Sequence, residues 1–340
     1  LRAGADQSGE RDVLRQLRHR DSCVEVLRLL ASSSGSSPEV GRAAADGPPG
    51  AEATSIVKES DFQPLRVLTW NIAGDQVSAS GPEWWTGADK VAAMRQNVAR
   101  WDADVVALQE FPGQDRWGGL DDSLELVGVA SAHAGFVHLY VKRGLPSERV
   151  SAPAKCPCVV AEVKLRGGTV QVASAHLAPG LGAAAVRLEQ VRQISKTCSG
   201  GSVVLLGDLN VREEEMEELR EVRGFSEAVY AGKSWDPRRN AFYADSKGQK
   251  DVDGLAFDRI LYVGGVFVQS YLVGVARLFS DAVPFCLSDH YGLLGVMDVH
   301  ESHGAVGGRA EGSRRRLAVS RLRDVACAKE RSVVAEQERD

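Results

Sequence analysis

Short apolar runs that end in polar residues recur through the middle of the chain. In Val203–Asn210 (VVLLGDLN), four apolar residues lead through a glycine to Asp208 and Asn210. A run without polar alternation is typical of a strand buried on both faces. Side chains alternate along an extended segment, so Asp208 and Asn210 are expected on one face, with Leu209 opposite. This octamer alone is equally compatible with an ordinary Asx-rich turn after a strand.

A strand–helix–strand unit is predicted near the start of the ordered region. Leu65–Trp70 (LRVLTW) predicts a strand that ends at Asn71. Asp104–Leu108 (DVVAL) predicts a buried strand that leads into Glu110. Between them, the apolar positions of Asp89–Trp101 fall on one stripe, as in an amphipathic helix. This order and spacing predict a βαβ-like unit.

The remaining pattern predicts mainly strands. They are expected at Phe136–Lys142, Val159–Leu165, Thr169–Ala175, Phe257–Val263, Val266–Val273 and within Leu287–Val296, with helices at 183–198 and Glu213–Glu221. The acidic Glu213–Glu221 helix is expected to present a solvated face, and Ser234–Asn240 predicts a loop that carries Trp235. His138 lies inside an alternating strand and is expected to be structural. Apart from that strand, residues 111–160 give the weakest pattern.

Composition indicates a soluble globular protein with flanking segments. The chain has 340 residues, 44% hydrophobic and 26% charged, with a net charge of −5. Three parts are predicted: an N-terminal helix and flexible linker (1–60), a catalytic domain (61–300), and a Gly-rich spacer with a basic helical tail (301–340). Residues 11–30 are expected to form a solvated or partner-binding helix. Arg314–Arg316 is compatible with an address signal or an RNA patch as well as with a solvated tail.

Several function classes are disfavoured by composition. The negative net charge provides no global basic field for wrapping a long duplex, so a nucleic-acid substrate would be met at an end or a short segment. No apolar run approaches membrane length. Cys156 and Cys158 are too close together for a usual zinc pair, so free thiols and a nuclear or cytoplasmic location are expected. Because the first residue is Leu1, the natural amino terminus is expected to lie upstream, with any targeting signal.

Polar residues at strand ends form the candidate site. They are Asn71, Glu110, His176, Asp208, Asn210, Asp258, Asp289 and His290. A sheet places such ends along one edge, where ligands bind. The set holds acids, amides and imidazoles but no Ser or Cys nucleophile beside a base, which suits one hard divalent cation acting on a phosphate. Glu110 is the expected Mg²⁺ ligand, assisted by Asn71, and Mn²⁺ is an alternative metal.

Five short motifs resemble the endonuclease/exonuclease/phosphatase superfamily. TWN (69–71), LQE (108–110), SAHL (174–177), GDLN (207–210) and SDH (288–290) occur in the order of that superfamily, over roughly residues 62–300. The resemblance implies a DNase I-like fold: a two-layered α/β sandwich of two packed, mainly antiparallel sheets flanked by helices. It also implies Mg²⁺-dependent hydrolysis of a phosphodiester by direct attack of water.

The resemblance also implies a role for each site residue. Asp208 would position and deprotonate the water, while Asn210, His176 and His290 would donate hydrogen bonds to the phosphate. Asp258 would hold the His290 ring, although an ion pair between Asp258 and Arg259 is the structural alternative. Glu110, Asn71 and Asp289 would serve the metal. Trp235 would stack on a base or an aromatic leaving group, or simply pack. Trp84 and Trp85 are expected to pack, and His133, His300 and His303 to be uninvolved.

Within the superfamily, the chain most resembles the tyrosyl-DNA phosphodiesterase 2 family. The shared runs are TWNI, GDLNVRE, SWDP, FDRILY and SDHYGLL, whereas SAHLAPG departs from that family's pattern. The implied substrate is a nucleic-acid 5′ end, DNA or RNA, that carries a protein or peptide adduct, and a monomer is expected. Two alternatives stay open: another phosphohydrolase such as a nuclease, deadenylase or small-phosphodiester phosphatase, and a non-catalytic adaptor acting through the flanking helices.

Overall fold

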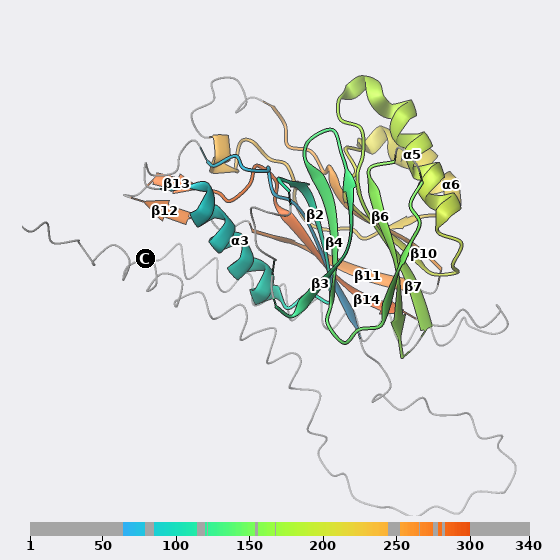
Figure 1. Cartoon of the computed structure of the whole chain (residues 1–340). Coiled ribbons are helices and arrows are strands. Elements are labelled where there is room, and N and C mark those ends of the chain that lie inside the picture. Colours follow the sequence, from blue (N-terminus) through green and yellow to red (C-terminus); the bar gives the residue numbers. More distant parts are fainter. Residues whose placement is uncertain are drawn as a thin grey trace, which may run out of the picture. The chain divides into compact units, whose positions relative to one another are not determined.

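Two six-stranded sheets packed face to face form the centre of the described part of the chain, which also contains a two-stranded sheet (Figure 1). The computed structural model describes residues 64–78, 85–113, 120, 122–153, 156–166, 168–243, 252–264, 266–274, 278–280 and 283–299. The predictions for residues 1–60 and 301–340, and for Trp84, His300 and His303, lie outside these residues. Within the described ranges, no helix is both long and apolar enough to cross a membrane.

The strands are mostly antiparallel, with one parallel pair in each sheet. The first sheet has the order β11 (Val266–Val273), β14 (Gly292–Val299), β1 (Leu65–Asn71), β2 (Val105–Phe111), β4 (Phe136–Lys142) and β3 (Leu124–Ser131). The second has the order β5 (Ser147–Val150), β6 (Cys158–Leu165), β7 (Gly168–His176), β8 (Val203–Asp208), β10 (Asp258–Val263) and β9 (Ser226–Glu227). The parallel pairs are β1 with β2 and β7 with β8. The predicted fold class is confirmed.

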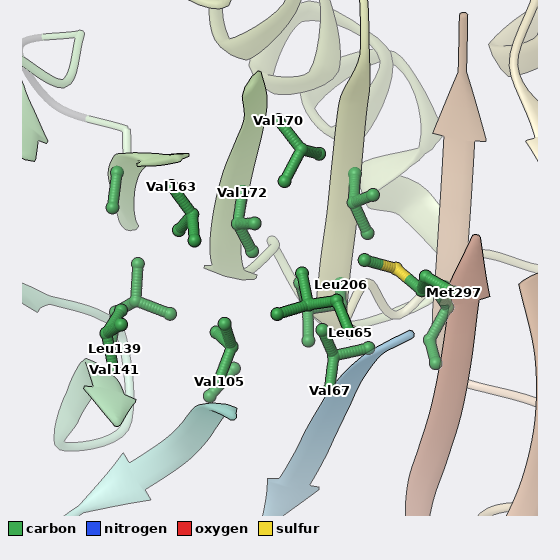
Figure 2. Packing of buried hydrophobic residues seen from close by; sticks show 14 of the residues in the cluster. Leu65, Val67, Val105, Leu139, Val141, Val163, Val170, Val172, Leu206 and Met297 are labelled. Atoms are coloured by element: carbon green, nitrogen blue, oxygen red, sulfur yellow. The ribbon is translucent and has the colours of Figure 1, made fainter. Parts of the chain in front are cut away.

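The apolar residues of the inner faces form the core between the sheets (Figure 2). Val67 and Val105 come from the first sheet, and Val172 and Leu206 come from the second. Because the strands are buried on both faces, a second apolar layer lies outside each sheet. Helix α3 (Gly87–Trp101) contributes Met94 and Val98 to one, and α5 (Ala184–Thr197) and α6 (Met216–Arg223) cover the other.

The sequence pattern missed several short elements. Strands β3 and β5 lie in the stretch with the weakest pattern: β3 has a register shift between Leu126 and Gly128, and β5 is an exposed four-residue strand. Neither shows the alternation that predicts a strand. Strands β9, β12 (Leu278–Ser280) and β13 (Val283–Phe285) were also not predicted. The 213–221 helix is not wholly solvated, because 3₁₀ turn η4 (Glu213–Glu215) leads into α6, which buries two apolar side chains.

The parallel pairs direct several polar strand ends to one side of the sandwich. Strands β1, β2, β7 and β8 finish there, and β10, antiparallel to β8, begins there with Asp258 opposite Asp208. Gly207 allows the last residues of β8 to lie close against β7. Its φ is +148°, and a Cβ at this position would lie 1.9 Å from the carbonyl oxygen of Ala175 on β7.

Replacing Gly207 tests how strictly this contact is required. We expect Gly207→Ala to lower the free energy of unfolding by about 3 kcal/mol or more, because backbone on a central strand must move. Urea denaturation measures the change. Gly87→Ala is the matched control, since a Cβ there meets nothing within 4 Å, and its effect should stay below about 1 kcal/mol. Equal effects of the two substitutions would contradict the prediction.

Candidate active site

The side chain of Asn71 joins the two sheets at the site. Its Nδ2 donates to Glu110 Oε1 on the neighbouring strand at 3.1 Å and to Asp208 Oδ2 on the other sheet at 2.9 Å. Its Oδ1 accepts a hydrogen bond from the Ala73 amide at 3.0 Å, which fixes the orientation of the carboxamide. Glu110 has a left-handed φ of 56° at a break in the β2–β4 register. This conformation aims a side chain differently from regular strand geometry.

Asp208 is a buried carboxylate surrounded by hydrogen-bond donors. Besides the Asn71 amide, it accepts a bond from the backbone N–H of Asn210 at 3.0 Å. The Nε2 atoms of His176 and His290 lie 3.4 Å and 3.9 Å from its Oδ2. Burial alone would raise the pKa of Asp208, but the two imidazoles and the hydrogen bonds hold it below its ordinary value. Asp208 is therefore ionised at neutral pH.

His290 and Asp258 form a buried pair. His290 Nδ1 lies 2.7 Å from Asp258 Oδ2, and the backbone N–H of Asp258 donates to Ser234 Oγ. Burial alone would lower the pKa of His290, but the carboxylates of Asp258 and Asp208 raise it to about 10. His290 is therefore an imidazolium beside a carboxylate.

The proposed ion pair between Asp258 and Arg259 does not form. Arg259 instead pairs with Glu227 and Glu213. The predicted alternative of an Asp258–Arg259 ion pair is therefore wrong, and Asp258 contacts the His290 ring instead.

His176 differs from His290 in charge. It is 1% exposed, and burial lowers its pKa to about 4, so it is neutral at neutral pH. Its Nδ1 has no hydrogen-bond partner among the described residues. Asn210 has a left-handed φ of 52°, and its Nδ2 donates to the Leu177 carbonyl at 3.2 Å. The same amide nitrogen carries a second hydrogen.

The carboxylates at this edge fit a divalent cation. Burial, together with the charges of Asp289 and Asp208, raises the pKa of Glu110, against the hydrogen bond from Asn71. A cation between these groups would relieve their mutual repulsion. In the described ranges, no group of three or more His, Cys, Asp or Glu side chains is placed to hold a metal ion. Mg²⁺ does not need one, because it keeps several waters and takes one or two carboxylates. Glu110 and Asp289 are the carboxylates that could hold it, and Asn71, whose Nδ2 faces this edge, would hold the Glu110 carboxylate in place.

Two residues at the site were not predicted from sequence. The His133 ring, on the turn between β3 and β4, lies 4.2 Å from the His176 ring, although it was expected to be uninvolved. Arg212 donates to the Asn210 carbonyl, and its guanidinium lies 5.0 Å over the Phe257 ring. Arg212 continues the alternation of Asp208 and Asn210, and this spacing is the signal in the sequence that points to it. His133 gave no comparable signal.

Other aromatic and histidine predictions can be placed. Trp235 is half-buried, its ring lies 5.8 Å from Phe257, and its backbone forms a bridge with His290. Its stacking role stays a prediction. Trp85 packs edge-on against Phe285, and His138 is buried against Phe111 with a bond to Tyr140, as expected.

The endonuclease/exonuclease/phosphatase family model matches residues 68–290, which include all the polar strand ends. The chain belongs to this family. Its members are generally phosphoesterases. No curated protein sequence matches the chain at the significance threshold applied.

Solved structures share the fold of this family member at low identity. TDP2 from D. rerio, complexed with a single-strand DNA product, gives a TM-score of 0.54 at 19% identity, over 69% of this chain and 98% of that one. An endonuclease/exonuclease/phosphatase from Bacteroides vulgatus gives 0.53 at 17%, over 70% and 100%. A mutant beta toxin from Staphylococcus aureus with bound magnesium ions gives 0.51 at 20%, over 69% and 99%. At these identities the likeness establishes the fold alone.

The pair of Asp258 and His290 generates a kinetic prediction. We expect Asp258→Asn to lower kcat for phosphodiester hydrolysis on the order of 10²-fold, because an imidazolium without its carboxylate is a weaker, less oriented donor. KM should change little. Asp122→Asn is the matched control, because Asp122 is exposed on the turn before β3, at the opposite end of that strand from His133. Thermal denaturation checks that the variant folds, and a folded variant with unchanged kcat would contradict the assigned pairing.

Proposed function

We propose that the chain is a Mg²⁺-dependent phosphodiesterase in which water attacks phosphorus directly. The observation that carries this proposal is the surrounding of Asp208, an ionised buried carboxylate within 4 Å of two imidazoles and bonded to the amide that also contacts Glu110. A base and phosphate donors are thereby placed together beside carboxylates that suit a metal. This combination is what hydrolysis of a phosphate ester requires.

Each residue has a defined task in this mechanism. Asp208 orients the water and takes its proton as the oxygen attacks phosphorus. His290, held charged by Asp258, donates to a non-bridging oxygen on which negative charge accumulates. His176 and Asn210 add neutral donors to the same group. Held by Glu110 and Asp289, with Asn71 orienting Glu110, Mg²⁺ would supply positive charge that stabilises the phosphate oxygens and the departing oxygen.

Direct attack is favoured over a covalent intermediate by the hydroxyl groups at the site. Ser288 Oγ donates a hydrogen bond to the carbonyl of Asn71, and Ser174 Oγ donates one to the carbonyl of His138. Neither hydroxyl is bonded to an imidazole in these contacts. A water on Asp208 is therefore the better nucleophile.

The substrate that we propose is a 5′-phosphotyrosyl link between DNA or RNA and a protein or peptide. The family motifs present in the chain support this substrate. The fold shared with TDP2, whose structure was solved with a single-strand DNA product, also supports it. The loop around Trp235 also supports it, since Lys233, Arg238 and Arg239 are exposed there. An aromatic side chain with nearby cations suits both a base and a phosphate backbone. A nuclear or cytoplasmic location stays a prediction.

A substrate panel tests reaction and substrate together. We expect rapid Mg²⁺-dependent hydrolysis of a 5′-tyrosyl oligonucleotide, with little activity on an abasic duplex, poly(A) or a small aryl diester. Asp208→Asn should lower kcat by about 10³-fold or more, since it removes the base. Equal rates in excess chelator would overturn the metal mechanism. Preference for poly(A) or the abasic duplex would make the chain another phosphohydrolase, and inactivity on every substrate would favour the adaptor.

The basic loop generates a prediction specific to nucleic acid. We expect the double variant Arg238→Glu/Arg239→Glu to raise KM for the oligonucleotide about 10-fold at low salt and to reduce its salt dependence, because phosphate contacts release counterions. Hydrolysis of the small diester should not change. Lys164→Glu/Arg166→Glu is the control, with the same charge change at the far end of β7 from His176. A KM effect shared by the control would exclude a local contact.

A further inference from the structure

A lysine on helix α3 is buried against the loop that follows β1. Lys90 is 1% exposed, which is rare for this residue type. Its Nζ lies 3.4 Å, 3.1 Å and 2.5 Å from the carbonyl oxygens of Ala73, Gly74 and Gln76. The partners in these bonds are backbone carbonyls rather than a carboxylate. The ammonium therefore binds the loop itself, and its position depends on the loop conformation.

The loop that Lys90 binds also orients Asn71. Ala73 has a left-handed φ of 54°, an uncommon conformation for a residue with a Cβ. In that conformation its N–H donates to Asn71 Oδ1, and the carboxamide then directs Nδ2 to Glu110 and Asp208. Consecutive hydrogen bonds thus connect Lys90, through Ala73, to the residue that joins the metal side of the site to the base.

A second segment of the site meets the same lysine. The Phe242 ring lies 5.5 Å from Nζ. Ser78, at the end of the loop, places its Oγ 3.2 Å from the carbonyls of Ala241 and Phe242. Asn240 Nδ2 donates to the carbonyl of Ser288, next to Asp289 and His290. The loop after β1 and the segment before β14 are therefore held together around Lys90.

The charge of Lys90 acts on the carboxylates of the site. Burial lowers the pKa of Lys90 to about 8, while Asp289, Asp75 and Glu110 act in the opposite direction. At neutral pH the ammonium remains charged and offsets part of the negative charge at the metal edge. A neutral side chain of similar volume would lose both this charge and the bonds to the loop. Because the loss of a nearby positive charge favours a bound cation, a lower Mg²⁺ affinity in such a variant reports the lost bonds to the loop.

We propose that Lys90 is a positioning residue that holds residues 72–78 in the conformation in which Asn71 joins Glu110 to Asp208, and that it thereby sets the affinity for Mg²⁺. The effect on Mg²⁺ affinity depends on the proposed function, whereas the effect on the loop conformation does not. Lys90 binds backbone carbonyls of the loop and acts through that backbone. Supporting groups of this kind typically change metal affinity by about 10- to 100-fold.

The test compares Lys90→Met with the unmutated full chain. We expect faster amide hydrogen exchange in residues 72–78, and a Mg²⁺ dissociation constant raised about 10-fold by calorimetry. The Mg²⁺ concentration for half-maximal hydrolysis should rise in parallel, with little change in substrate KM. Lys142→Met is the matched control, because Lys142 pairs with Asp102 and Asp104 on the surface. It should leave both the exchange and the Mg²⁺ affinity unchanged.

The outcomes separate this inference from the proposed function. Unchanged exchange in 72–78 together with unchanged Mg²⁺ affinity would overturn the role of Lys90. An unmutated chain that hydrolyses nothing would overturn the proposed function. The exchange measurement would still decide whether Lys90 holds residues 72–78 in place. If Lys90→Met does not fold, Lys90→Gln, which keeps a donor without the charge, is measured instead, with the same exchange and affinity criteria.

Discussion

The burial of Asp208 as a charged carboxylate is the constraint on which the site depends. Removing an ion from water costs several kcal/mol unless donors replace the lost hydration, and a hydrogen bond to a charged group returns about 1.5–3 kcal/mol. The hydrogen-bond donors are the Asn71 amide on β1 and the Asn210 backbone, and the imidazoles of His176 on β7 and His290 before β14 lie within 4 Å. Both sheets must therefore be in register before the carboxylate is tolerated. The surroundings of the Asp208 carboxylate are therefore complete only when both sheets have folded and packed together.

Strand direction explains how residues distant in sequence meet. If every neighbouring pair were antiparallel, consecutive strands would end at opposite edges. The parallel pairs, β1 with β2 and β7 with β8, bring their carboxyl ends to the same side. The crossover connections that such pairs require are α3 in the first sheet and α5 in the second. The helices are thus needed for the position of the site as well as for covering the sheets.

The polar residues at the strand ends could be predicted from sequence, because they lie where a run of apolar residues gives way to polar ones. Asp208 follows a run of buried apolar residues, so its place at the end of a strand is a local property. The conformation of Glu110 is not local, since its positive φ accompanies a break in the pairing with β4. The burial of Lys90 could not be predicted from the sequence, because a lysine in an amphipathic helix is simply one more polar position. Only the loop after β1, brought back against α3, explains why its ammonium is buried.

The charges at the site separate the reaction from the choice of substrate. Glu110, Asp208, Asp258 and Asp289 are countered within the described residues by the His290 imidazolium, the Lys90 ammonium and the Arg212 guanidinium. The remaining negative charge disfavours a bare phosphodiester, which is itself an anion, and a divalent cation reverses that balance. In the proposed mechanism, metal binding would therefore serve the approach of the substrate as well as the chemical step. The rim formed by Trp235 and the exposed arginines lies outside this balance. Under the proposed function, changes there would alter which phosphodiester is held, while the buried groups would act on the phosphate in each case.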